Sequence, residues 1–168
     1  MTLSLIIGNI LALLAVICMA VSVVKRSKKD LIYWQSLDTV FFIASTVVLS
    51  SYSAVVTNTV SLIRNIFAYK GRLTKKLTWV FCFVSVIIGL YLNNRGFIGW
   101  LPVIATLQYT ICLYITKDEQ QMRYALIFNL IFWLVHDSYI QSYPSAINCF
   151  VLIIWTAYQA VQHIKRSS

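Results

Sequence analysis

The chain has 168 residues, of which 60% are hydrophobic and only 11% are charged. A soluble domain carries about 25% charged residues, so the composition favours a membrane protein and excludes a disordered chain, a nucleic-acid-binding domain and a disulfide-stapled secreted module. The formal net charge of +9 comes from short basic clusters between apolar runs, as in cytoplasmic loops that face anionic lipid.

The first predicted element is a retained transmembrane helix from Leu3 to Val24. No basic residue precedes this run, and the cluster Lys25-Arg26-Ser27-Lys28-Lys29 follows it. A cleavable signal peptide has the opposite charge order and a small-residue cleavage site. The run is therefore expected to stay in the membrane, with its N-terminus outside.

Six more apolar runs follow, and most come close to the roughly 20 residues that a membrane-spanning helix needs. Polar or basic turns separate them, of which Asn93-Asn94-Arg95-Gly96 is the clearest. The sequence therefore predicts an all-α integral membrane protein with seven transmembrane helices. The six runs are Leu31 to Ser50, Ala54 to Tyr69, Leu77 to Leu92, Ile98 to Ile115, Met122 to Ile140 and Ser145 to Ile164.

The distribution of basic residues tests this count. With the N-terminus outside, Arg95 is the one member of the 14 Lys and Arg residues that falls on the outer side. Six or eight spans break this alternation, so the positive-inside rule favours seven spans with the C-terminus in the cytoplasm. The inner side receives Lys25, Arg26, Lys28, Lys29, Arg64, Lys70, Arg72, Lys75, Lys76, Lys117, Arg123, Lys165 and Arg166.

The order of the spans indicates an internal repeat. Spans one to three and spans five to seven run in the same directions, because the fourth span inverts the chain between them. This predicts a 3+1+3 parallel repeat, with a three-helix unit over residues 1–73, a linker helix over 74–96 and a second three-helix unit over 97–168. Parallel repeats of this kind place a substrate site between the halves, near the middle of the membrane.

Sequence matches between the two halves agree with this plan. A shift of about 90 positions places Asn58 on Asn148, and it places Thr39-Val-Phe-Phe-Ile-Ala near Asn129-Leu-Ile-Phe-Trp-Leu. The same shift, within one position, brings together the turns Ser51-Tyr52-Ser53 and Ser142-Tyr143-Pro144.

Two amides and two aromatic side chains are the first candidates for solute binding. Asn58 and Asn148 each offer donors and an acceptor to the hydroxyls or ring nitrogens of a neutral polar ligand. Phe42 and Trp133 lie upstream of them at similar intervals and offer aromatic faces for stacking. The alternative is that the amides only hold helices together.

Further polar residues lie inside the predicted spans. Gln108 and Asn129 lie near the middle of the fifth and sixth spans, and they either line a cavity or bridge helices. The pair His136-Asp137 lies toward the outer end of the sixth span, where it is either interfacial or a sensor of external pH.

The acidic residue Asp38 in the second span and the basic residue Arg64 in the third allow three interpretations. Asp38 and Arg64 lie at similar depths in neighbouring helices, so they are candidates for a structural ion pair. Alternatively, Arg64 snorkels to the inner surface while Asp38 faces water. In the third reading, Asp38 is a carboxylate that couples transport to protons or cations.

Patterns typical of catalysis or cofactor binding are absent from the sequence. The chain has no phosphate-binding glycine loop and no His-x-x-His pair, and it contains only two His and five Asp and Glu residues. Its cysteines, Cys18, Cys82, Cys112 and Cys149, lack metal-ligand or redox spacing. We therefore expect no enzyme activity, no metal and no cofactor.

Several segments resemble one family of small membrane proteins. The stretch Asn58-Thr-Val-Ser-Leu-Ile-Arg64-Asn65-Ile with its following basic loop resembles the YgjV-like family of bacterial inner-membrane proteins, as do Trp100-Leu-Pro102-Val-Ile-Ala-Thr106, Met122-Arg123 and the sixth span with Trp133. The family is placed beside the SWEET, semiSWEET and PQ-loop transporters and near the PnuC vitamin transporters. Their plan of three, one and three helices agrees with the predicted topology, and the resemblance implies the bacterial inner membrane.

The same resemblance implies roles for individual residues. In SWEET-type proteins an Asn in the third helix of each half contacts the sugar beside an aromatic residue, which implies such roles for Asn58, Asn148, Phe42 and Trp133. The chain departs from these relatives because it has no Pro-Gln dipeptide and no proline in its first span. The hinge that those prolines supply is therefore in doubt in the first half.

These observations predict a facilitator of a small polar solute, such as a sugar, a nucleoside or a vitamin-like compound. Uniport is favoured over coupled transport because the spans hold few titratable groups. Expected partners are the solute, membrane lipid and a second copy of the chain, and no nucleic acid. The alternative is a non-transporting accessory, immunity or sensor protein. A central space shared by Asn58 and Asn148 distinguishes the first from the second.

Overall fold

The computed structural model describes residues 3–23, 28–115 and 119–167, and the chain is entirely helical within these ranges apart from short turns. Seven helices form where the apolar runs predict them, with ends that differ by a few residues. The helices are α1 (Leu3–Val23), α2 (Lys28–Val48), α3 (Tyr52–Tyr69), α4 (Lys75–Leu92), α5 (Phe97–Ile115), α6 (Glu119–Tyr139) and α7 (Tyr143–Ser167).

Four of these helices contain segments long and apolar enough to cross a membrane by length and composition. The remaining three carry polar side chains in their middle, and α2 holds a shorter apolar segment over Ile32–Val48. The described part of the chain thus supports an all-helical membrane protein with at least four candidate spans. The four segments are Leu3–Ser22, Lys75–Leu92, Phe97–Ile115 and Tyr143–Gln162.

The distribution of side chains is that of a protein in an apolar solvent. The side chains that are almost wholly buried are mostly small or polar, among them Ser22, Thr57 and His136, whereas large apolar side chains such as Phe83 and Phe150 are exposed. In water this arrangement would leave extensive apolar patches uncovered. In lipid it is favourable, because small interior residues let helices approach closely and the apolar exterior meets hydrocarbon.

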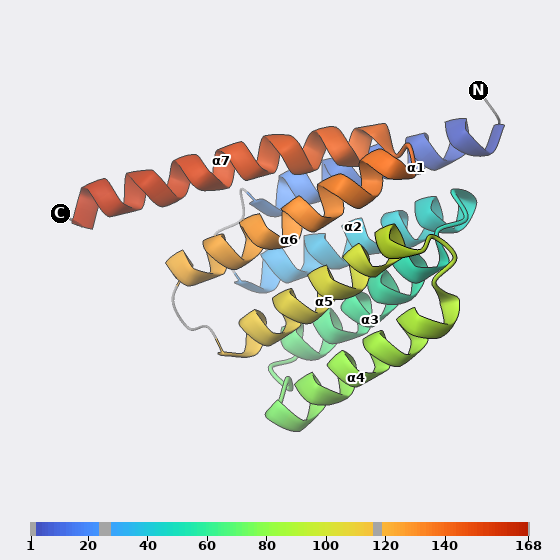
Figure 1. The fold of residues 1–168 in the computed structure, drawn as a ribbon. Coiled ribbons are helices and arrows are strands. Elements are labelled where there is room, and N and C mark those ends of the chain that lie inside the picture. The colour runs from blue at the N-terminus through green and yellow to red at the C-terminus, as the bar shows by residue number, and fades with distance from the viewer. Residues whose placement is uncertain (1–2, 24–27, 116–118, 168) are drawn as a thin grey trace.

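Six of the seven helices form a closed ring, and α4 lies outside it (Figure 1). Around the ring, α1 packs on α2, α2 on α3, α3 on α5, α5 on α6, α6 on α7 and α7 on α1. Helix α4 packs on α3 and α5 from outside. Successive helices alternate in direction, so α1 begins at one end of the bundle and α7 finishes at the other (Figure 1).

Two turns of the bundle have the same hydrogen-bond pattern. Ser50 in the α2–α3 turn and Gln141 in the α6–α7 turn both have positive φ, 54° and 62°. Four backbone bonds around the first turn recur around the second with both residue numbers raised by 91. These pairs are Leu49 N to Ser45 O and Ile140 N to His136 O; Ser50 N to Val47 O and Gln141 N to Ser138 O; Ser51 N to Thr46 O and Ser142 N to Asp137 O; and Val55 N to Ser51 O and Ala146 N to Ser142 O.

This spacing refines the shift of about 90 positions predicted from the sequence. The offset of 91 that matches the turns also matches Phe42 with Trp133. Asn58 and Asn148 are separated by 90 positions, so Thr57 is the residue whose position in its turn-and-helix unit corresponds to that of Asn148. Under the offset of 91, Asn58 is therefore one position away from the residue that corresponds to Asn148.

The described basic residues gather at one end of the bundle. Exposed Lys70, Arg72, Lys75 and Lys76 surround the connection from α3 to α4, whereas Arg95 lies in the connection from α4 to α5 at the opposite end. Of the other residues that enter the charge argument, Lys25, Arg26 and Lys117 lie outside the described residues.

Candidate functional site

A polar cavity of about 130 Å³ lies inside the ring of six helices. Every ring helix contributes to its wall, whereas α4 does not. The lining residues are Met19 of α1; Gln35, Asp38, Thr39 and Phe42 of α2; Asn58, Ser61, Arg64 and Asn65 of α3; Thr106 and Tyr109 of α5; Leu126, Asn129, Leu130, Trp133 and Asp137 of α6; and Ser145, Asn148, Cys149 and Leu152 of α7.

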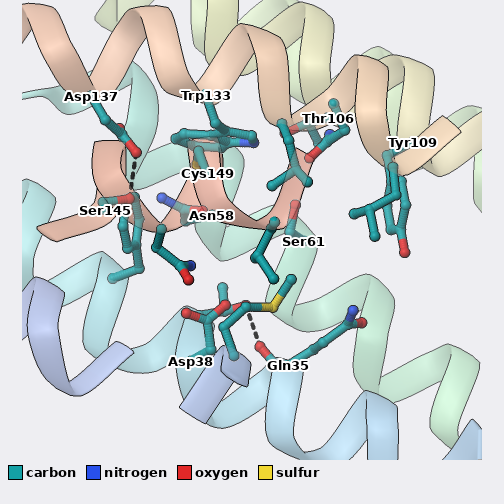
Figure 2. A pocket seen from close by; sticks show the side chains of 18 of the residues that line it. Gln35, Asp38, Asn58, Ser61, Thr106, Tyr109, Trp133, Asp137, Ser145 and Cys149 are labelled. Atoms are coloured by element: carbon teal, nitrogen blue, oxygen red, sulfur yellow. Dashed lines mark hydrogen bonds between the residues drawn. The ribbon is translucent and has the colours of Figure 1, made fainter. Parts of the chain in front are cut away.

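The two amides of the predicted site line this one cavity, from α3 and from α7. Asn58 is only 6% exposed, and its Nδ2 has no hydrogen-bond partner among the described residues. Figure 2 shows its side chain in the midst of the lining residues. An amide that only held two helices together would donate to the facing helix. The free Nδ2 of Asn58 is instead available to a group inside the cavity.

The two aromatic candidates meet at the cavity wall. The rings of Phe42 and Trp133 lie edge to face, with centroids 5.7 Å apart and planes at 88°. Trp133 makes a second edge-to-face contact with the imidazole of His136, at 5.6 Å and 89°. These two contacts fix the orientation of the indole, since edge-to-face geometry is the favoured one for aromatic pairs.

Arg64 does not form the predicted ion pair with Asp38. Among the residues that the structure describes, no Asp38 oxygen lies within 4.0 Å of the guanidinium. Its Nη1 donates to Thr110 Oγ1 at 2.9 Å, and its Nη2 and Nε donate to Asn65 Oδ1 at 2.9 and 3.2 Å. The guanidinium also lies 5.2 Å from the centre of the Tyr109 ring, within cation–π range.

This arrangement also excludes the snorkelling reading of Arg64, because the residue is only 4% exposed. The side chain instead joins α3 to α5, since Thr110 and Tyr109 both belong to α5. The ion-pair prediction was wrong because similar depth in the membrane does not fix which side of a helix a residue faces. The flexible arginine side chain instead bonds to neutral acceptors, Asn65 on its own helix and Thr110 on α5.

Asp38 faces the cavity from α2. No residue in the described ranges donates a hydrogen bond to its carboxyl group or forms an ion pair with it. Its neighbours on the helix bond elsewhere: Thr39 Oγ1 donates to the Gln35 carbonyl oxygen at 2.6 Å and Ser36 Oγ to the Ile32 carbonyl oxygen at 2.7 Å. The carboxyl group is therefore open to a molecule in the cavity.

The pair His136-Asp137 is buried and is not interfacial. Both side chains are 0% exposed, and His136 Nδ1 lies 2.9 Å from Asp137 Oδ1. His136 Nε2 lies 3.0 Å from Ser51 Oγ in the α2–α3 turn, and Ser145 Oγ donates to Asp137 Oδ2. This chain of hydrogen bonds links residues of both halves of the ring.

The last two candidates bridge helices. Gln108 is absent from the cavity wall, and its Nε2 donates to the Ala125 carbonyl oxygen of α6 at 3.1 Å. Asn129 lines the cavity and also donates to the Ala105 carbonyl oxygen of α5 at 2.8 Å. Gln108 thus bridges helices without lining the cavity, whereas Asn129 both bridges helices and lines the cavity.

Several lining residues were not singled out by their sequence pattern. Ser61 and Asn65 follow Asn58 at spacings of three and seven, which place all three on one helix face, and Ser145 and Cys149 flank Asn148. A helical wheel centred on each candidate amide identifies Ser61, Asn65 and Ser145, because residues three, four or seven apart share a face. It does not identify Cys149, which is adjacent to Asn148 in the sequence. No such signal predicts which helix lies opposite.

Comparison with known proteins identifies one family. The family model Imp-YgjV, described as a bacterial inner membrane protein, matches residues 6–167. The chain therefore belongs to this family of bacterial inner membrane proteins. Comparison with curated proteins and with solved structures finds no match.

Proposed function

We propose that this member of the inner-membrane family is a facilitator that moves a small polar solute across the bacterial inner membrane. In this proposal all seven helices span the lipid, with the N-terminus outside. Helices α1–α3 and α5–α7 are two like-oriented units joined by α4, on the plan of the SWEET and PnuC transporters. Solute binds between the units, and their relative rocking exposes it to one side at a time.

The observation that supports this function best is a cavity built jointly by the two units. The unit over residues 1–73 supplies Asn58 and Phe42, and the unit over 97–168 supplies Asn148 and Trp133. A polar cavity at such an interface is costly in a membrane unless a function retains it. A non-transporting accessory protein has no need of this space, so the shared cavity favours transport over the alternative.

Several hydrogen bonds between the units lie at the end of the bundle that carries the two matched turns. Asn9 of α1 donates to the Gln141 carbonyl oxygen at 3.2 Å and accepts from Tyr143 N at 3.0 Å. The Ser51–His136 bond lies at the same end. In the proposed cycle these bonds hold the turn end closed, and breaking them opens the cavity on that side.

Uptake into proteoliposomes tests this function. Purified protein is reconstituted and screened with labelled sugars, nucleosides and vitamin-like compounds, and at least one is expected to enter faster than into protein-free vesicles. Asn58→Ala and Asn148→Ala should abolish that uptake. Thr59→Ala and Ile147→Ala are matched controls, because each is an exposed neighbour on the same helix.

The result that contradicts the proposal is equally definite. If no compound of the screen enters, and the protein co-purifies in fixed ratio with another membrane protein, the transport hypothesis is rejected in favour of an accessory protein. If a compound enters and the two Asn variants carry it at the wild-type rate, transport stands and the site assignment fails.

A further inference from the structure

The charge balance of the cavity points to the charge of its ligand. Asp38 has no donor among the described residues, whereas both oxygens of Asp137 are engaged, one by His136 and the other by Ser145. Removing a carboxylate from bulk water is unfavourable unless an opposite charge and hydrogen bonds compensate it. The wall thus presents one carboxyl group whose compensation the protein does not supply.

The cation of the same wall already has hydrogen-bond acceptors within the protein. Three N–H groups of Arg64 donate to Asn65 and Thr110, and its guanidinium plane lies by the Tyr109 ring. It is farther than 4.0 Å from Asp38, as judged over the described residues. Arg64 therefore does not neutralise Asp38 through a direct contact.

A second, independent feature also requires a ligand. Asn58 is more than nine-tenths buried and lines the cavity, yet its Nδ2 is without an acceptor in the described structure. A buried donor left unpaired is unfavourable. An oxygen or ring nitrogen of a bound molecule would remove this cost.

The third feature is the orientation of Trp133. Its contacts with Phe42 and His136 hold the indole in place, and Figure 2 shows the ring edge-on to the viewer, with one face toward the other lining side chains. The face of an indole attracts cations more strongly than that of any other side chain. Asp38 and Trp133 therefore favour the same sign of charge from different elements.

We infer that the cavity takes a small organic monocation, an amine or an amidine. Its N–H groups donate to Asp38, its body lies against the face of Trp133, and an oxygen or ring nitrogen accepts from Asn58. The inference rests on the proposed function, because it names the class of solute that this cavity would carry. A space of about 130 Å³, roughly ten times what one water needs, suits a compound of about ten heavy atoms.

Three pyridines of one size and shape test the charge. 3-(Aminomethyl)pyridine is a cation at pH 7, 3-(hydroxymethyl)pyridine is neutral and pyridine-3-carboxylate is an anion, and all three keep the ring nitrogen that Asn58 would meet. Binding is measured by protection of Cys149, which lines the cavity, from N-ethylmaleimide in a chain with Cys18, Cys82 and Cys112 replaced by alanine. The unfolding midpoint in detergent is read in parallel and does not depend on labelling.

Only the cation is expected to protect Cys149 from labelling. At a concentration about ten times its Kd it should slow labelling about tenfold and raise the unfolding midpoint, while the other two compounds change neither. Asp38→Asn should remove the protection, and Asp38→Glu should keep part of it. Asp30→Asn is the matched control, because Asp30 is an exposed acid of the same helix.

Each other outcome overturns the inference. Equal protection by the neutral compound or the anion, or full protection of Asp38→Asn by the cation, would show that charge at Asp38 does not select the ligand. Neutral solutes that enter proteoliposomes would leave the proposed function intact in that case. Failure of all three pyridines to protect Cys149 or shift the midpoint also removes the inference, and the uptake screen then decides the function separately. If Asp38→Asn does not fold, the comparison of the three compounds on the wild-type side chain still decides the question.

Discussion

Phe42 of α2 and Trp133 of α6 touch edge to face at 5.7 Å although their helices are not neighbours in the ring. Their side chains bridge the space between the two helices, and both rings line the cavity. Such a contact is worth about 0.5–1.5 kcal/mol beyond the area that it buries. It therefore supports the indole without locking the two units together.

Trp133→Ala should weaken solute binding and also destabilise the fold, because the indole packs against the buried Leu130, Cys149 and Leu152. Loss of the ring face should lower affinity about 2- to 10-fold, by the usual worth of an aromatic contact, and Trp133→Phe should retain part of it. The measurement is the KM of uptake together with the unfolding midpoint. Trp155→Ala is the control, since that ring is exposed on α7; an equal rise in KM there would contradict the assignment.

Arg64→Ala should be strongly destabilising. It removes three hydrogen bonds from a charged donor and the link between α3 and α5, which predicts a loss on the order of 2 kcal/mol or more in the free energy of unfolding. Arg64→Lys should recover little, because an ammonium cannot reproduce the guanidinium fork. Denaturation in detergent measures both, with exposed Arg72→Ala as control. Wild-type stability of Arg64→Ala would show that the buried network contributes nothing.

His136→Ala should loosen the turn end of the bundle. It breaks the bonds to Ser51 and Asp137, and two bonds of about 1 kcal/mol each allow roughly a tenfold or greater rise in opening. The measurement is the alkylation rate of Cys149 by a membrane-impermeant thiol reagent applied from either side of sealed vesicles.

The rate should rise from one side only, and that side identifies where the matched turns face. The positive-inside prediction places them outside. Ser138→Ala is the control, because Ser138 lies on the exposed surface of the same helix. Faster labelling from the cytoplasmic side would reverse the predicted orientation.

Gly89→Ala should disrupt the contact of α4 with α5. A Cβ at this position would lie 2.6 Å from Val103 Cγ2, and overpacking of this kind costs about 1–3 kcal/mol. Gly89→Ala combined with Val103→Ala should be more stable than Gly89→Ala alone, because the second change removes the obstructing methyl groups. If the double variant loses as much stability as the two single variants together, the proposed close approach of Gly89 to Val103 is contradicted.

The helices were predictable from the sequence, whereas their arrangement was not. Apolar runs and turn signals placed the ends of α1, α3 and α5 within two residues, because such runs report length and local turns directly. The ring order depends on which faces of α3 and α5 meet, and hydrophobic periodicity carries no information about the partner.

The candidate site was likewise predictable only in part. Asn58 and Asn148 could be chosen because a shift of about 90 positions pairs them, and Phe42 and Trp133 because they lie at similar intervals upstream. All four line the cavity. The burial of His136 could not be predicted from its place near the end of a span. It results from the turn that brings Ser51 over the imidazole, a tertiary contact between segments 85 positions apart.

The two matched turns pair cavity-lining positions that differ in chemistry. The offset of 91 aligns Asp38 with the amide Asn129, and it aligns Thr46 with the acid Asp137. Each half thus carries its acid where the other half is neutral. A molecule in the cavity would therefore meet unlike side chains on its two sides. A protein assembled from two identical copies of either half would lose that difference, however well its helices packed.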